Sequence, residues 1–108
     1  MTISTHVLDT SSGTPAKGVP FQLLSADDSQ IAKGTTNADG RTQDLQGINL
    51  SSGTYRMIFD TTTYFTSQNI KDFFYPKVEL YFTVTDPESH YHVPLILSPY
   101  GFSTYRGS

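Results

Sequence analysis

The feature that most restricts the fold of this sequence is a strict alternation of apolar and polar residues in short runs. Between residues 78 and 85 every second residue is apolar, namely Val78, Leu80, Phe82 and Val84. In a second run, Tyr91, Val93, Leu95 and Leu97 form a wholly apolar face, opposite His92, Pro94 and Ile96. Because successive side chains of a β-strand point to opposite faces, each run predicts a strand with one face buried in a core.

Shorter runs of the same kind are separated by clusters of turn-forming residues such as Asp39-Gly40. We expect strands over residues 3–8, 19–24, 30–36, 54–59 and 102–106, with a further short piece near residues 43–45. One helix of two to three turns is expected over residues 60–70. Asp60 or Thr61 would cap it, and Tyr64, Phe65 and Gln68 would form its apolar face. Seven to eight short strands at this spacing predict an all-β sandwich of two sheets.

The size and composition of the chain exclude several classes of protein. The 108 residues suit a single domain spanning residues 1–108. A net charge of −3 without a basic stripe argues against nucleic-acid binding, and no apolar run is long enough to cross a membrane. The absence of cysteine excludes disulfides and thiolate chemistry within the chain. The N-terminal residues lack a basic segment followed by an apolar one, so we expect a cytoplasmic protein, with the periplasm and the peroxisome left open.

The polar residues in the strands suggest a functional face. His6 and His92 are predicted on the side of their strands that points away from the core. The alternative interpretation is that both are ordinary exposed surface histidines. His90 and His92 share one strand face and could bind zinc together with His6, but the usual metal-binding spacings are absent, so no metal or cofactor is expected. Arg41 directly follows the Asp39-Gly40 turn, where its guanidinium could hold a planar, oxygen-rich ligand.

Four segments in order resemble the transthyretin-related 5-hydroxyisourate hydrolases. They are His6-Val7-Leu8-Asp9, Gly40-Arg41, Tyr91-His92-Val93-Pro94-Leu95 and the terminal Ser103-Thr104-Tyr105-Arg106-Gly107-Ser108. The resemblance implies a transthyretin-like β-sandwich that forms a homotetramer, a dimer of dimers with its active sites at the dimer–dimer interface. Pro94 would then interrupt an interior strand, where proline is unusual, so we expect a local irregularity or a missing ladder bond there.

The resemblance also implies an activity and a set of site residues. The activity is hydrolysis of 5-hydroxyisourate to 2-oxo-4-hydroxy-4-carboxy-5-ureidoimidazoline in urate degradation. The implied catalytic residues are His6, Arg41, His92 and Ser108, and the implied substrate-binding residues are Arg41, Tyr105, Arg106, Gly107 and Ser108. Direct attack by water is expected, with either histidine as general base. The alternative is a small-ligand carrier of the transthyretin type that performs no catalysis.

Overall fold

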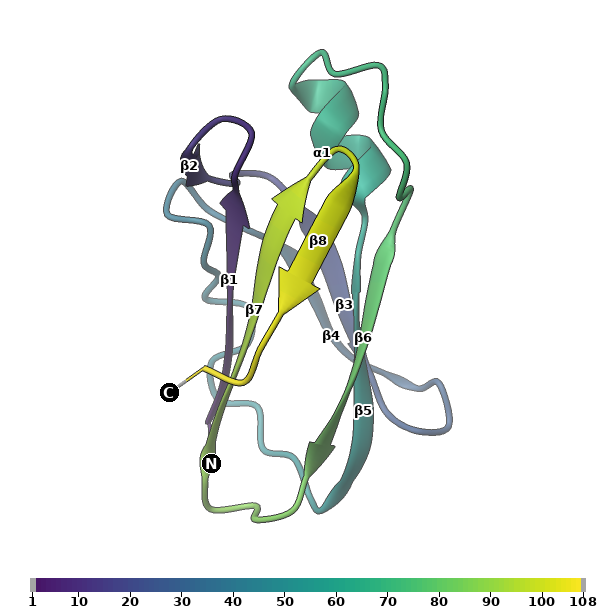
Figure 1. The fold of residues 1–108 in the computed structure, drawn as a ribbon. Helices are drawn as coiled ribbons and strands as arrows, with labels where there is room; N and C mark the ends of the chain where they lie inside the picture. Colours follow the sequence, from purple (N-terminus) through teal and green to yellow (C-terminus); the bar gives the residue numbers. More distant parts are fainter. Residues whose placement is uncertain (1, 108) are drawn as a thin grey trace.

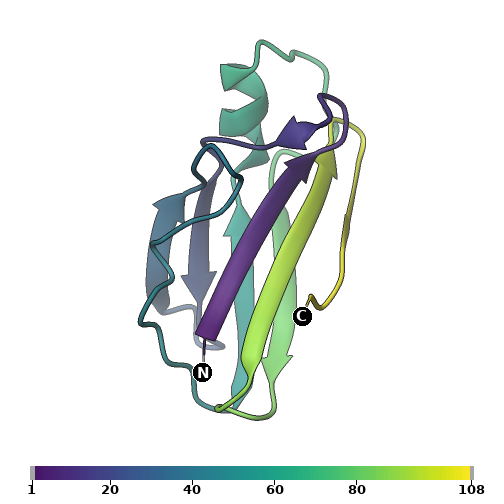
Figure 2. The same ribbon diagram turned by 90° about the vertical axis from the view of Figure 1, so that its left-hand side faces the viewer.

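Two four-stranded sheets pack face to face in the computed structural model, which describes residues 2–107 (Figures 1 and 2). The first sheet has the order β2 (Thr14–Pro15), β1 (Thr2–Asp9), β7 (His90–Ser98) and β8 (Gly101–Thr104). The second has the order β4 (Gln30–Thr35), β3 (Pro20–Leu24), β5 (Gly53–Phe59) and β6 (Val78–Val84). The predicted sandwich of seven to eight strands is therefore confirmed.

The alternation that predicted the strands separates the core from the surface. On β6, Val78, Leu80 and Val84 are buried while Glu79, Tyr81 and Thr83 are exposed. The predicted inner face of β7 is buried along its whole length. Both sheets contribute fully buried side chains to one core, among them Leu23, Met57, Phe59, Leu95 and Leu97.

A single short helix, α1 (Thr61–Ser67), lies at the end of the sandwich where β7 turns into β8 (Figure 1). Asp60 caps it by accepting a hydrogen bond from the backbone N–H of Thr63. The hydroxyls of its three successive threonines are all hydrogen-bonded: Thr61 donates to the Tyr75 carbonyl, Thr62 to the Pro76 carbonyl and Thr63 to the Asp60 carboxylate.

Three sequence-based expectations about local structure were wrong. Gln68 is exposed and ends the helix, so the buried face consists of Thr61, Tyr64 and Phe65. Residues 43–45 form a bend and a turn rather than a strand, and only Leu45 of that segment is buried. The segment that contains the two-residue strand β2 was expected to be a loop, because so short a strand produces no periodic pattern in the sequence.

A buried hydrogen-bond network joins the end of β1 to α1. The Asp9 carboxylate accepts hydrogen bonds from the Tyr64 hydroxyl at 2.6 Å and from the Ser11 backbone N–H and hydroxyl at 2.9 and 2.6 Å. Burial alone would raise the pKa of the Asp9 carboxyl, but the hydrogen bonds from Ser11, Tyr64 and the Ser12 amide outweigh burial and lower it. Burial and the bond to Asp9 raise the pKa of Tyr64.

The first sheet is mixed, because β1 and β7 pair in parallel with Ser4 beside His92 and His6 beside Pro94. Inside the sandwich this contact is reinforced by the buried Thr5 hydroxyl, which donates to the Val93 carbonyl at 2.7 Å. The parallel register places the polar residues of the two strands next to one another on the outer face of the sheet, away from the core.

The ladder between β7 and β8 is interrupted at Pro94, as the sequence predicted. It runs from Ser98↔Gly101 to Leu95↔Thr104 and continues in the same register only at the isolated bridge between His92 and Gly107. Proline has no N–H to donate, and the Pro94 carbonyl accepts from the Thr104 hydroxyl at 2.6 Å. Within residues 2–107, no helix is long and apolar enough to span a membrane.

Candidate active site

Two parallel strands carry the histidines. His6 on β1 and His92 on β7 both lie on the outer face of the first sheet, as their alternation predicted, and both are partly buried. The neighbouring outward residues are Ser4 on β1 and His90 on β7. The Ser4 Oγ lies 2.8 Å from His92 Nδ1 and 3.3 Å from His90 Nε2. The rings of His90 and His92 are stacked nearly parallel, with centroids 6.4 Å apart.

The turn that carries Arg41 is fixed to β1 by the backbone of Gly40. The Gly40 carbonyl accepts a hydrogen bond from the Val7 N–H at 2.8 Å, directly after His6. Gly40 has a φ of +73°, and a Cβ at this position would overlap the Val7 carbonyl oxygen and come within 3.2 Å of the His6 ring. Only glycine therefore allows this approach, which brings Arg41 next to the histidine strands.

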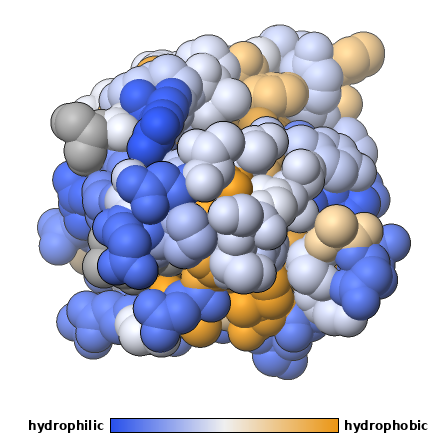
Figure 3. Space-filling view, turned by 90° about the horizontal axis from the view of Figure 1, so that it is seen from below, coloured by the Kyte–Doolittle hydropathy of each residue, from blue (hydrophilic) through white to orange (hydrophobic). Residues whose placement is uncertain are grey.

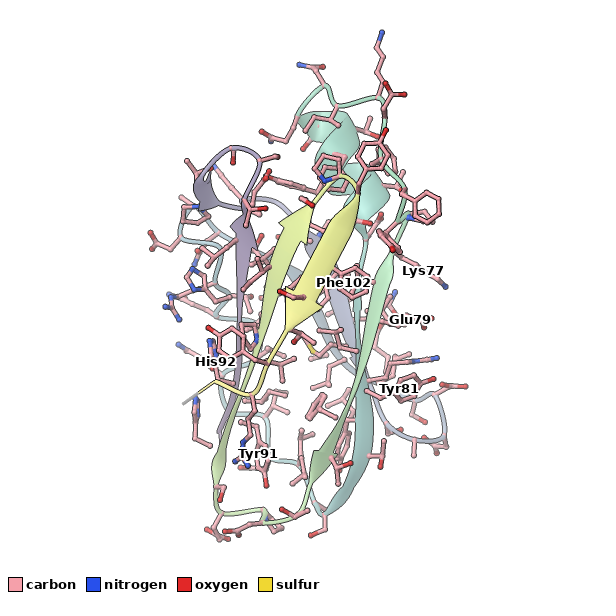
Figure 4. All side chains as sticks on the ribbon, viewed as in Figure 1. Lys77, Glu79, Tyr81, Tyr91, His92 and Phe102 are labelled. Atoms are coloured by element: carbon pink, nitrogen blue, oxygen red, sulfur yellow. The ribbon has the colours of Figure 1, made fainter. Side chains whose placement is uncertain are left out.

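The C-terminal segment reaches the same face. After β8 the chain passes in front of β7 (Figure 1), and the Gly107 N–H donates to the His92 carbonyl at 2.9 Å. The Gly107 backbone lies directly against the imidazole, because a Cβ there would come within 3.0 Å of His92 Cγ and nearer still to Cδ2. In Figure 4 the labelled His92 lies beside this segment, on the opposite side of the molecule from Lys77.

These elements enclose an open pocket of about 340 Å³ on the outer face of the first sheet. Its lining residues are Ser4, His6, Arg41, His90, His92, Tyr105 and Gly107. The structure thus brings together five of the residues expected from the sequence, in segments from both ends and the first half of the chain. Of the other two expected residues, Ser108 lies outside the described residues.

Arg106 is the one expected residue within 2–107 that does not line this pocket. Its guanidinium lies 4.5 Å from the centre of the Tyr91 ring and donates to the His90 carbonyl at 3.3 Å. It lines a neighbouring groove of about 410 Å³ between β6 and the β7–β8 edge, as do Tyr91 and Tyr105. Figure 3 shows the end of the sandwich opposite α1, where apolar residues are visible between polar ones. Arg106 therefore anchors the C-terminal segment from the side of this groove.

The electrostatic environment of the pocket keeps His92 neutral. Burial lowers the pKa of the His92 imidazole below its usual 6.5, and the positive charge of Arg41 lowers it further, as do the neighbouring imidazoles His90 and His6 whenever they carry a proton. A neutral imidazole at physiological pH has one nitrogen free to accept a proton. Within residues 2–107, no group of three or more His, Asp or Glu side chains is arranged to hold a metal ion.

Sequence reasoning assigned no role to Ser4 and considered His90 only as a zinc ligand. The signal that could have pointed to both is their position on the same strand faces as His6 and His92, two residues away in each case. Alternation places them on the correct face, but it does not state which strands are neighbours. The contact between Ser4 and the two histidines depends on the parallel register of β1 and β7.

Comparison with known proteins places this geometry in a family. The family model described as HIUase/Transthyretin family matches residues 3–107. The chain belongs to the HIUase/Transthyretin family. Among its relatives, 5-hydroxyisourate hydrolase 2 of Rhizobium meliloti (strain 1021) is 44% identical, over 98% of this chain and 95% of the relative.

Solved structures of the HIUase/Transthyretin family have the same fold. The structure of Klebsiella pneumoniae 5-hydroxyisourate hydrolase has a TM-score of 0.88 at 34% identity, covering 99% of this chain and 93% of the other. Sea bream transthyretin in complex with thyroxine has a TM-score of 0.87, also at 34% identity, covering 99% and 95%. Because the two TM-scores are nearly equal, the fold alone does not distinguish between the two kinds of protein, and the side chains of the pocket must.

Proposed function

We propose that this chain is an enzyme that hydrolyses 5-hydroxyisourate to 2-oxo-4-hydroxy-4-carboxy-5-ureidoimidazoline, a step of urate degradation. The observation that carries the proposal is the convergence of His6, Arg41 and His92 on one open pocket. Relatives at 44% identity that bear the name of this hydrolase support it. A protein that only binds a ligand has no need of a neutral imidazole beside a guanidinium.

His92 is the proposed general base. Its lowered pKa leaves it neutral near pH 7, and it lies at the partly buried side of the pocket. It takes a proton from a water molecule as that water attacks the ring amide, and it passes the proton to the leaving nitrogen as the C–N bond breaks. Such a base typically contributes a rate factor of about 10²–10⁴. The second water proton stays on the new carboxyl group until that group ionises.

Arg41 and His6 act on the developing negative charge. A guanidinium presents a fixed fork of N–H donors, which suits the planar oxygens of the substrate and the oxyanion formed on water attack. His6, held beside the Gly40 turn, orients the water or donates to that oxyanion. Tyr105 forms one wall of the pocket, Arg106 and Gly107 position the C-terminal segment, and Ser108 contributes a hydroxyl to the substrate.

The pocket is also proposed to lie between subunits of a homotetramer. β6 and β8 are edge strands of their sheets, and exposed aromatic side chains occur on or beside them: Tyr81 is 69% exposed, Tyr100 67% and Phe102 40%. Unpaired edges with exposed aromatic residues favour pairing with another chain. Two such dimers would face each other across the histidine surfaces. Light scattering after size exclusion should give about four times the 12.0 kDa chain mass, whereas a monomer would contradict the assembly.

A direct assay tests the activity. 5-Hydroxyisourate is generated with urate oxidase, and its ultraviolet decay is followed with and without the protein. We expect strong acceleration by the wild type and loss of most of it in His92→Ala, His6→Ala and Arg41→Ala, each with an unchanged circular dichroism spectrum. Binding of the substrate without accelerated decay would indicate a carrier and would contradict the proposal.

The pH profile tests the assignment of the base. Because the pKa of His92 lies below 6.5, kcat/KM should fall on the acid side with an apparent pKa below that value. Arg41→Gln removes a positive charge that disfavours the imidazolium, so besides lowering kcat/KM it should move the acid limb to higher pH. Lys77→Gln makes the same charge change across the molecule and should leave the limb in place (Figure 4). An unmoved limb in Arg41→Gln would exclude His92 as the group that titrates.

A further inference from the structure

The hydroxyl of Ser4 lies between two imidazoles, and this arrangement constrains which nitrogen of His92 carries the proton. Ser4 Oγ is 2.8 Å from His92 Nδ1 and 3.3 Å from His90 Nε2. A serine hydroxyl has one proton to donate and lone pairs to accept with, so it cannot donate to both rings at once. If it donates to His90, then His92 must donate to it.

We propose that Ser4 is a positioning residue that fixes the tautomer of His92, with His90 fixing the direction of the Ser4 hydroxyl. In this arrangement the Nδ1–H of His92 donates to Ser4 Oγ, and the Ser4 hydroxyl donates to His90 Nε2. The other nitrogen of His92, Nε2, then carries no proton and is free to accept one. The inference rests on the proposed function, because it concerns how the general base of that reaction is prepared.

The imidazole of His92 is also contacted on other sides. These contacts fix the orientation of the ring, so that Nδ1 points to Ser4. The Gly107 backbone lies against the ring carbons, and the Gly107 N–H donates to the carbonyl of the same residue at 2.9 Å. The ring of His90 is stacked nearly parallel to it, at an interplanar angle of 12°. With Nδ1 turned to Ser4 and ring carbons turned to Gly107, Nε2 is the nitrogen left for the reaction.

A neutral hydroxyl suits this base better than a carboxylate would. A carboxylate at Nδ1 would stabilise the imidazolium and raise the pKa of His92, whereas burial and the positive charges around the pocket lower it. Ser4 opposes that effect only weakly, because its contact with His92 raises the pKa less than burial and the neighbouring positive charge lower it. As His92 takes up the proton of the attacking water, its bond to Ser4 becomes charge-assisted and strengthens. No proton has to leave along the chain, because His92 returns its proton to the leaving nitrogen.

His90 completes the arrangement by accepting from Ser4. A neutral imidazole has one nitrogen that can accept a hydrogen bond, and Nε2 is the His90 nitrogen within reach of Ser4 Oγ. A cationic His90 could only donate, which would turn the Ser4 proton towards His92 and favour the wrong tautomer. His90 therefore acts through Ser4 rather than on the substrate.

Substitution of Ser4 tests the proposal. Ser4→Ala should lower kcat about 10–100-fold, a range typical of losing an outer hydrogen-bond partner, while KM changes less than about threefold. Ser4→Thr keeps the hydroxyl and suits a strand, so it should recover most of the activity. His90→Phe should have a smaller effect than Ser4→Ala, because the bond between Ser4 and His92 remains. Ser98→Ala makes the same change on the neighbouring strand β7, on the face that carries His92, and should behave as wild type.

Nitrogen-15 NMR of the histidine rings gives a readout that a merely structural role would not change. We expect a neutral His92 protonated at Nδ1 in the wild type, and a shift towards the Nε2–H tautomer in Ser4→Ala. An unchanged tautomer with wild-type kcat in Ser4→Ala would overturn the proposal, as would a Ser4→Thr variant no better than Ser4→Ala. If the wild type does not hydrolyse 5-hydroxyisourate, the proposed function fails, and the NMR spectra still decide the role of Ser4.

Discussion

The contact between Gly107 and His92 allows a sharp test of how closely the C-terminal segment controls the site. In Gly107→Ala the added Cβ would come within 3.0 Å of His92 Cγ and nearer still to Cδ2, whereas ordinary contacts of this kind begin at 3.4 Å. The imidazole and the segment must therefore separate by about 1 Å, and a displacement of this size at a reacting group can lower the rate about 100-fold. That factor corresponds to about 2.7 kcal/mol of transition-state stabilisation.

The assay is the decay of 5-hydroxyisourate, with thermal unfolding measured in parallel. We expect kcat/KM of Gly107→Ala to fall about 100-fold while Tm changes by only a few degrees, because Gly107 lies outside the core. The backbone of Gly107 is not in the left-handed region, so the effect should come from the contact alone.

Gly101→Ala is the matched control, because it makes the same change on the same C-terminal segment. A Cβ at Gly101 meets only the Ser98 hydroxyl, at an ordinary 3.6 Å, so activity should remain near wild type. Wild-type activity in Gly107→Ala, or an equal loss in both variants, would refute the view that Gly107 positions the His92 ring.

Two further predictions concern stability. Gly13 and Gly40 both have a φ of +73°, but only at Gly40 would an added Cβ overlap backbone, the Val7 carbonyl oxygen. In urea unfolding we expect the free energy of unfolding to fall by about 1 kcal/mol in Gly13→Ala and by at least twice that in Gly40→Ala. Tyr64→Phe removes a hydrogen bond to the buried Asp9 carboxylate and should cost about 1–3 kcal/mol at pH 7, while Tyr100→Phe at the surface should cost little. Since the folded pKa of Asp9 lies below its usual 3.8, its ionised form stabilises the fold above about pH 4. That stabilisation is lost as the pH falls through the folded value, so the deficit of Tyr64→Phe should shrink in acid; a pH-independent deficit would contradict the role of the carboxylate.

The faces of the strands could be predicted from the sequence because alternation is a local property. It placed His6 and His92 on the outer side of their strands correctly. Pro94 indicated the interruption of the ladder once the family resemblance had implied an interior strand there. The capping residue and the aromatic pair predicted where the helix lies. They did not predict where it ends, because Gln68 is exposed and does not extend the buried face.

The details of the site could not be predicted in the same way, because they depend on contacts between distant segments. Ser4 gains its importance only from the parallel register that sets it beside His92, and no local pattern specifies that register. Arg106 carries the same charge as Arg41, yet it faces Tyr91 instead of the pocket. Its direction depends on how the chain passes over β7 after the interruption at Pro94.

The parallel pairing of β1 with β7 has a consequence for the order in which the molecule is completed. Ser4 and His92 are 88 residues apart, whereas the strands of the second sheet all lie between residues 20 and 84. During synthesis at about 5–20 residues per second, β1 emerges first and waits on the order of ten seconds for its partner. The second sheet can pair during that interval, while the apolar residues of β1 remain uncovered. We therefore expect the pocket to be the last part of the chain to form, so that turnover in a translation reaction would appear only after the entire fold has closed.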